Sequence, residues 1–95
     1  MAAYVIALRT KLTDAAEMAA YTALARRTFP PGTKVLAAYG QHETPEGAPV
    51  EGAVVIEFPS FEIAQAWYRS PAYQAALQHR FAGAEFNLVI VDGLG

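Results

Sequence analysis

The 95-residue sequence has no cysteine and little charge. Without cysteine it can form neither a disulfide framework, a thiolate nucleophile nor a cysteine-based zinc site, and a reducing cytoplasmic setting fits this composition. Only seven residues are lysine or arginine, against nine acidic ones, and apart from the Arg26–Arg27 pair the basic residues are scattered. Since binding to a phosphate backbone needs a stripe of positive charge, nucleic acid is not expected as a partner.

Long apolar runs are missing as well. The opening apolar run, residues 2–8, is too short to span a bilayer and lacks the basic start of a secretory signal, so no membrane partner is expected. Yet 54% of the residues are hydrophobic and only 17% are charged. A chain this short buries only about 60–65% of its unfolded surface. We therefore expect one domain over residues 1–95 that covers part of its apolar surface with a second copy of itself.

Alternating apolar residues predict four strands, over residues 3–11, 34–42, 53–58 and 85–93. Gly40, near the end of the second predicted strand, favours a bulge or a close backbone approach there. Between the second and third strands, residues 43–52 contain glycine and proline and are predicted to form the long tip of a hairpin.

Capping residues predict where the helices begin. Asp14 and Glu17 have the spacing of a capping box, and the sequence FPPG at residues 29–32 ends the helix that follows. Ser60 is the expected N-cap of a second helix, with Glu62 in its first turn, where the amide dipoles favour a carboxylate.

The sequence AWYRSPAYQ, residues 66–74, interrupts this second helix. Pro71 disfavours a helical conformation at Ser70, while Ser70 can cap a new helix with proline at its first position. Beyond the bend, Tyr73, Leu77 and Phe81 recur every four residues and predict an amphipathic helix.

The predicted order is β-α-β-β-α-β, a ferredoxin-like α+β fold with a four-stranded antiparallel sheet and an extra short helix before the last strand. The helices would cover one face of the sheet. The other face would carry Val5, Val55, Val89 and Val91, or the opposite set of residues if the faces are reversed. Either set is apolar, so we expect two copies to join through these sheet faces as a homodimer with a shared barrel core.

The segment VVIEFPSFEIAQAWYRSPAYQAALQHR, residues 54–80, closely resembles the signature of domain-of-unknown-function family 1330 in the dimeric α+β barrel superfamily. AYVIA at residues 3–7 and LVIVDG at residues 88–93 match that family too. The resemblance implies the fold and a homodimer. Related superfamily members include cofactor-free monooxygenases, isomerases and haem-binding enzymes. Many family members carry an arginine before the glycine of the second strand, where this sequence has Tyr39 before Gly40.

Familiar catalytic motifs are absent from the sequence. It has no Ser-His-Asp order, phosphate-binding glycine loop or dinucleotide fingerprint. Its two histidines, His42 and His79, have no second ligand at metal-binding spacing, so no metal is expected. Neither histidine lies in an evidently apolar segment that could form the wall of a haem pocket, so no cofactor is expected either.

His42 is the candidate catalytic residue, as a general base, although a solvated histidine at the edge of a loop has the same sequence pattern. His79 is expected on the surface. Glu57 lies among apolar strand residues and needs a partner, for which Arg9 or Lys34 across the sheet are candidates.

The candidate binding site combines Tyr39 of the second predicted strand with residues at and beyond the helical bend: Trp67, Tyr68, Tyr73 and Arg80. Trp67 and Tyr73 can equally fill the core with Tyr68 at its margin. Arg80 shares a helix face with Tyr73, where its guanidinium can clamp a carboxylate or tie down helix ends.

These residues and His42 predict a pocket between sheet and helices that binds a small organic molecule, or catalyses a cofactor-independent reaction on it. Tyrosine or histidine would then serve as proton donor and acceptor. The alternative is a structural or interaction module whose aromatic residues are all core. A cavity of about 300 Å³ or more with converging polar groups favours the first, and filled packing favours the second.

Overall fold

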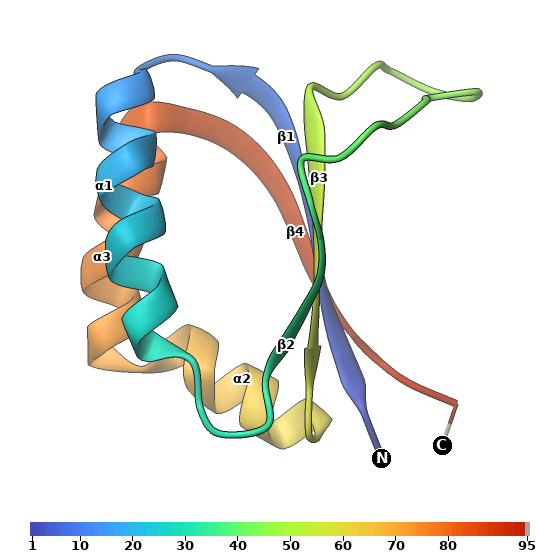
Figure 1. Ribbon diagram of the computed structural model, residues 1–95, viewed down its shortest axis with the longest axis vertical. Helices are drawn as coiled ribbons and strands as arrows, with labels where there is room; N and C mark the ends of the chain where they lie inside the picture. Colours follow the sequence, from blue (N-terminus) through green and yellow to red (C-terminus); the bar gives the residue numbers. More distant parts are fainter. Residues whose placement is uncertain (95) are drawn as a thin grey trace.

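The computed structural model describes residues 1–94 as one antiparallel sheet with helices on one face (Figure 1). The strands are β1 (Ala3–Leu12), β2 (Lys34–Ala38), β3 (Gly52–Phe58) and β4 (Ala84–Asp92). The helices are α1 (Ala15–Ala25), α2 (Phe61–Arg69) and α3 (Pro71–Gly83), with a 3₁₀ turn over Arg26–Thr28. The sheet order is β2-β3-β1-β4, so the predicted ferredoxin-like fold is confirmed. No helix within residues 1–94 is long and apolar enough to cross a membrane.

The predicted helix caps are present. Asp14 Oδ1 accepts hydrogen bonds from the backbone N–H groups of Ala16 and Glu17, and Ser60 Oγ accepts one from Ile63 N–H at 3.1 Å. The Glu17 side chain, however, does not close a capping box, because its carboxylate contacts His79 on α3.

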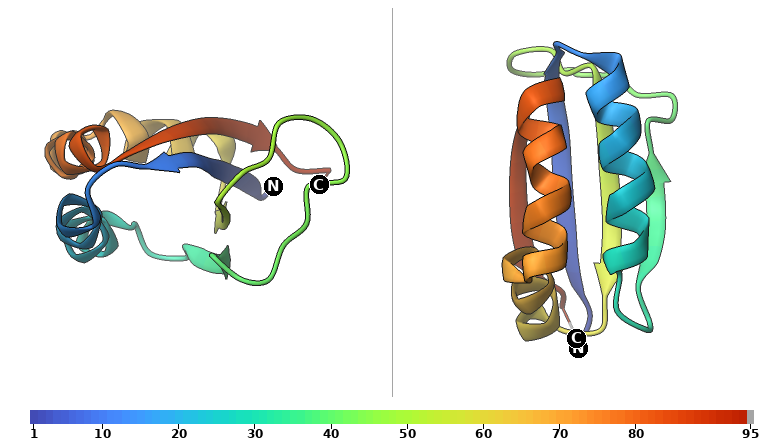
Figure 2. Two further views of the ribbon diagram at one scale, coloured as in Figure 1. Left: turned by 90° about the horizontal axis from the view of Figure 1, so that it is seen from above. Right: turned by 90° about the vertical axis from the view of Figure 1, so that its left-hand side faces the viewer.

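The Ser-Pro bend separates two helices, as predicted. Ser70 Oγ accepts a hydrogen bond from Tyr73 N–H at 3.2 Å and donates one to the carbonyl oxygen of Trp67 at 2.7 Å. Pro71 is the first residue of α3, where its missing N–H costs nothing. The extra helix predicted before β4 is therefore present, with 13 residues in α3 against nine in α2. Figure 2 shows α3 lying alongside α1.

The second strand is shorter than predicted. It ends at Ala38, and its bulge lies between Val35 and Ala37, not at Gly40. Tyr39 adopts a φ of 56°, a left-handed conformation that turns the chain out of the strand. The loop over residues 39–51 then projects beyond the sheet on the side away from the helices (Figures 1 and 2).

The assignment of Val5 to the uncovered face was wrong. Val5 pairs with Ile56 and Ile90 and is buried in the core beneath the helices. The bulky rings of α2 and α3 occupy the space above β1, so β1 presents small side chains to them. The uncovered side, which we call the bare sheet face, carries Tyr4, Ile6, Leu8, Val55, Val89 and Val91.

Candidate functional site

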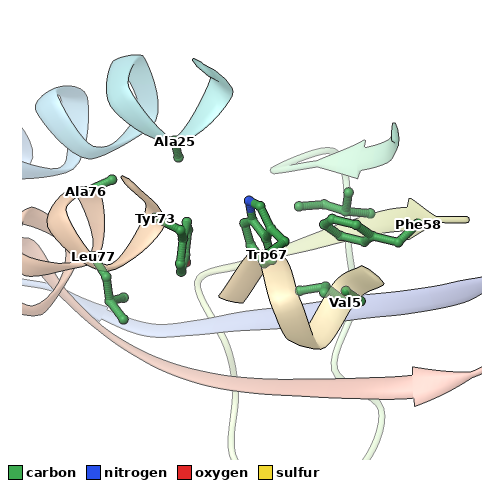
Figure 3. Close-up of a cluster of buried hydrophobic side chains, with 9 residues drawn as sticks. Val5, Ala25, Phe58, Trp67, Tyr73, Ala76 and Leu77 are labelled. Carbon is green, nitrogen blue, oxygen red and sulfur yellow. The ribbon is translucent and has the colours of Figure 1, made fainter. Parts of the chain in front are cut away.

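The aromatic cluster at the helical bend forms the centre of the core (Figure 3). Trp67 lies between Tyr73 and Phe58, with ring centroids 4.1 and 4.9 Å away. Its indole N–H donates a hydrogen bond to Thr28 Oγ1 at 2.9 Å, so both the ring and its polar tip have partners. This packing supports the core interpretation of Trp67 and Tyr73.

A hollow remains beside this core, between the sheet and α1. This central hollow has a volume of about 130 Å³ and is bounded by residues from all four strands and all three helices. Its apolar walls include Val5, Ala25, Val35, Val54, Ile56 and Leu88. Three of the predicted binding residues, Tyr39, Trp67 and Arg80, also line it.

Tyr39 is held at this hollow by its backbone and by Gly52. A Cβ atom at Gly52 would lie 2.5 Å from Tyr39 Cδ1, so only glycine leaves room for the ring there. The guanidinium of Arg9 lies over the same ring, 4.8 Å from its centroid. Burial raises the pKa of the Tyr39 phenol, and the charges of Arg9 and Arg80 oppose that rise. A strained, tightly held polar side chain of this kind is typical of functional sites.

Arg80 brings a positive charge into the interior. It is only 5% exposed, and none of the ion pairs found within residues 1–94 includes it. Instead its guanidinium lies 4.8 Å from the ring centroid of Phe86 and 5.7 Å from that of Tyr21. Aromatic faces compensate only part of the cost of burying a cation, so Arg80 is available to an anion.

Tyr21 also lines the central hollow, and sequence reasoning missed it. Its hydroxyl lies 2.8 Å from that of Tyr73, which is fully buried. Burial, followed by the neighbouring Tyr21 phenol, raises the pKa of Tyr73 well above its ordinary value of 10.0. Met18, Tyr21 and Ala25 recur at the spacing of one helix face, but no sequence signal pairs Tyr21 with a residue 52 positions away.

A second hollow, which we call the β4 groove, lies between α3 and β4. It has a volume of about 370 Å³ and is bounded by Tyr68, Arg80, Phe81, Phe86 and Ile90, among others. Arg80 therefore borders both hollows, while Tyr68 borders only the groove. Phe81, predicted to face the core, is 62% exposed, because the helical repeat of 3.6 residues turns Arg80 inward in its place.

His42 lies outside both hollows, in the projecting loop. Its ring nitrogens are 3.3 Å from the carbonyl oxygen of Gly40 and 3.1 Å from that of Val50, so the ring bridges the two sides of the loop. Its proposed role as a general base stays a prediction.

The other polar candidates make structural contacts. Lys34 Nζ lies 4.0 Å from Glu57 Oε2, one of the two partners predicted for Glu57. His79 is only partly exposed, and its Nδ1 lies 2.7 Å from Glu17 Oε2, which joins α3 to α1. Within residues 1–94, no group of three or more histidine or acidic side chains is arranged to hold a metal ion.

Solved structures with a similar fold cover almost the whole chain. A protein of unknown function from Rhodopseudomonas palustris aligns with a TM-score of 0.77 and 21% identity, over 99% of this chain and 83% of its own. A dimeric α+β barrel (dabb) family protein with a ferredoxin-like fold from Mesorhizobium loti aligns with a TM-score of 0.66 and 14% identity, over 100% of both chains.

A third similar structure is a cofactor-independent oxygenase, SnoaB, from Streptomyces nogalater. It aligns with a TM-score of 0.60 and 12% identity, over 99% of this chain and 93% of its own. At these identities the three structures establish the fold alone.

No curated protein sequence matches this chain. A family model does match it, over residues 2–94, which includes the helical bend, Tyr39 and every residue named at the central hollow. The chain therefore belongs to the family described as a domain of unknown function (DUF1330).

Proposed function

We propose that this protein is a cytoplasmic homodimer that binds a small organic molecule in the central hollow and acts on it without a cofactor. The observation that carries the proposal is the combination of an apolar hollow with a buried guanidinium on its wall that lacks an acidic partner within residues 1–94. Ligand sites are typically apolar cavities with a few polar groups of this kind.

The size of the hollow limits what it can hold. The central hollow has about 130 Å³, which is smaller than the cavity of about 300 Å³ or more that the sequence led us to expect for a binding protein. A dry cavity of about 150 Å³ is enough for one benzene molecule. The proposed ligand is therefore a compound with a single ring or of similar size.

Chemistry on such a ligand would use tyrosine phenols and Arg80. Tyr39 and Tyr21, which carry phenol groups, and Arg80, which carries positive charge, line the hollow. The similarity to a cofactor-independent oxygenase supports this part of the proposal only in showing that the fold can host such chemistry.

The bare sheet face supports the homodimer. On it, Val89 is 49% exposed and Val91 is 44% exposed, next to Ile6 and Val55. A standard interface buries about 800 Å² per partner, and if about 60% of that is apolar the gain is at most about 12 kcal/mol per subunit before association costs. The loop over residues 39–51 projects on the same side and would extend along the partner.

Blocking the hollow tests the binding proposal. Val35 lies on its wall and is 53% exposed, while its neighbour Leu36 is 54% exposed and lies outside the hollow. Val35→Trp should fill the hollow and Leu36→Trp should not. We expect compounds with a single ring, at 100 times their Kd, to stabilise the native protein by about 2.7 kcal/mol and so raise its Tm by roughly 10 °C or more. This shift should vanish in Val35→Trp and persist in Leu36→Trp.

The alternative is a structural module whose main property is dimerisation, and the filled packing around Trp67 favours it. The same experiment separates the two functions. If no compound in a panel of neutral, anionic and cationic rings raises the Tm of the unmodified protein, the binding proposal is wrong and the structural module stands.

A further inference from the structure

We infer that the central hollow contains an oxyanion subsite, in which Arg80 and the Tyr21 hydroxyl together receive the negatively charged oxygen of a planar, single-ring ligand. This inference rests on the proposed function and deepens it by naming the ligand's charge, its size and the two donors that bind it.

Charge is the first argument. Arg26 and Arg80 are the ionisable side chains other than tyrosine on the wall of the hollow, and within residues 1–94 no acidic residue lines it. Arg9 lies nearby over Tyr39, but it is paired with Glu51, with its Nε 3.4 Å from Glu51 Oε1. The charge of Arg80 is therefore not neutralised where it meets the hollow, and a bound anion would neutralise it.

The direction of the Tyr21 proton is the second argument. Within residues 1–94, the hydroxyl of Tyr73 has the hydroxyl of Tyr21 as its one hydrogen-bond partner, and Tyr73 is fully buried. If Tyr21 donated, the Tyr73 proton would be buried without an acceptor, which costs about 1–3 kcal/mol. If Tyr73 donates, its oxygen keeps only an unused lone pair, which costs less. Tyr73 therefore donates to Tyr21.

That assignment frees the Tyr21 proton. The Tyr21 oxygen accepts from Tyr73, so its own O–H is available to the hollow that Tyr21 lines. The Arg80 guanidinium lies 5.7 Å from the centroid of the Tyr21 ring, so the two side chains are neighbours on the wall of the hollow. Tyr73 acts here as a positioning residue, because it orients Tyr21 without contacting the ligand.

The shape of the hollow is the third argument. A volume of about 130 Å³ with walls such as Val54, Ile56 and Leu88 accommodates a flat apolar ring. An inorganic anion would leave these walls without contacts, and a long-chain acid would exceed the volume. The matching class of ligand is a ring that carries a carboxylate or a phenolate oxygen.

The test uses 4-nitrophenol as the probe, because its anion absorbs visible light and its neutral form does not. Its absorbance is titrated against pH, free in buffer and bound to the intact protein. The oxyanion subsite should lower the pKa of the bound probe below that of the free probe, because Arg80 and Tyr21 stabilise the anion. An apolar hollow without such donors would raise it.

Variants assign the effect to its residues. Arg80→Met should lower affinity for the anion by about tenfold or more, since charge-assisted hydrogen bonds are the strong ones, and should move the pKa of the bound probe upward. Tyr21→Phe alone would leave the Tyr73 hydroxyl buried and unpaired, so the double variant Tyr21→Phe/Tyr73→Phe is used instead. Its affinity for the anion should also fall by about tenfold. Tyr4→Phe, which removes a phenol from the bare sheet face, is the matched control and should leave the affinity within about threefold.

Three results would overturn the inference. If the probe binds as the neutral phenol with a raised pKa, the oxyanion subsite is wrong while small-molecule binding stands. If neither form of the probe binds at millimolar concentration, or if Val35→Trp leaves binding unchanged, the inference is wrong for this hollow. Only the complete absence of binding across the ring-compound panel would remove the proposed function as well.

Discussion

Tyr73 shows how one side chain can belong to the core and influence the candidate site. Its ring packs 4.1 Å from the Trp67 centroid, and its hydroxyl reaches Tyr21 at the edge of the central hollow. Because the ring is fully buried, the neutral phenol is strongly preferred over the phenolate. The same burial that stabilises the fold therefore keeps the Tyr73 phenol protonated.

The raised pKa of Tyr73 predicts a loss of stability at alkaline pH. Above the ordinary tyrosine pKa of 10.0, the unfolded chain releases this proton while the folded chain keeps it. The unfolded state then binds fewer protons, so the free energy of unfolding falls as pH rises, by up to about 1.4 kcal/mol per pH unit. Urea unfolding at pH 8 to 11 should show this slope.

Tyr73→Phe is the control for that experiment, because phenylalanine keeps the ring and cannot ionise. In this variant the free energy of unfolding should fall less steeply with pH above 10. Part of the slope should remain, because the pKa of Tyr39 is also raised. An unchanged slope would show that Tyr73 is accessible to solvent in the folded state.

At the scale of elements, the joint between α2 and α3 decides where the candidate side chains lie. Ser70 ends one helix and begins the next, so the axis changes direction between Trp67 and Tyr73. Trp67 then packs against Phe58 of β3, while α3 runs beside α1 and turns Arg80 toward the sheet. A straight helix through residues 61–83 would not place both Trp67 and Arg80 on the wall of the central hollow.

We expect Ser70→Ala to lower the free energy of unfolding by about 1–2 kcal/mol. Ser70 Oγ caps α3 and also donates to Trp67, so two hydrogen bonds are lost. Ser60→Ala is the matched control, since within residues 1–94 the N-cap bond to Ile63 is the one hydrogen bond of Ser60 Oγ, and it should cost about 0.5–1 kcal/mol. Equal losses in chemical denaturation would show that the second bond of Ser70 contributes nothing.

At the scale of the whole molecule, one face of the sheet lacks the helices that cover the other (Figure 2). Both faces are apolar because β3 places branched side chains on each side, Ile56 on one and Val55 on the other. Within residues 1–94, no helix or strand covers the second face. A second copy is the partner that we propose for it.

Val89→Glu tests that partner. A carboxylate at the centre of an apolar interface would be buried without a counter-charge, so the variant should shift the protein from a species of twice 10.2 kDa to the single chain. Analytical ultracentrifugation at micromolar concentration measures the change. Ala23→Glu, on an exposed position of α1, adds the same charge and should leave the dimer intact. A folded monomer before any substitution would contradict the dimer proposal.

The features that sequence alone determined are local ones. The caps at Asp14, Ser60 and Ser70 depend on residues two to four positions apart, and the period-two patterns identify all four strands. Such interactions can be evaluated from a short window of sequence, because the groups involved meet whenever the segment folds.

Tertiary structure decided what lies between those elements. The end of β2 depends on Tyr39 fitting against Gly52, the hollow depends on gaps left by packed rings, and the Tyr21–Tyr73 contact joins residues 52 positions apart. Packing also decided on which face of the sheet Val5 lies, because the large rings of α2 and α3 fill the space above β1. These contacts are set by how whole elements pack, and sequence spacing carries no direct record of that packing.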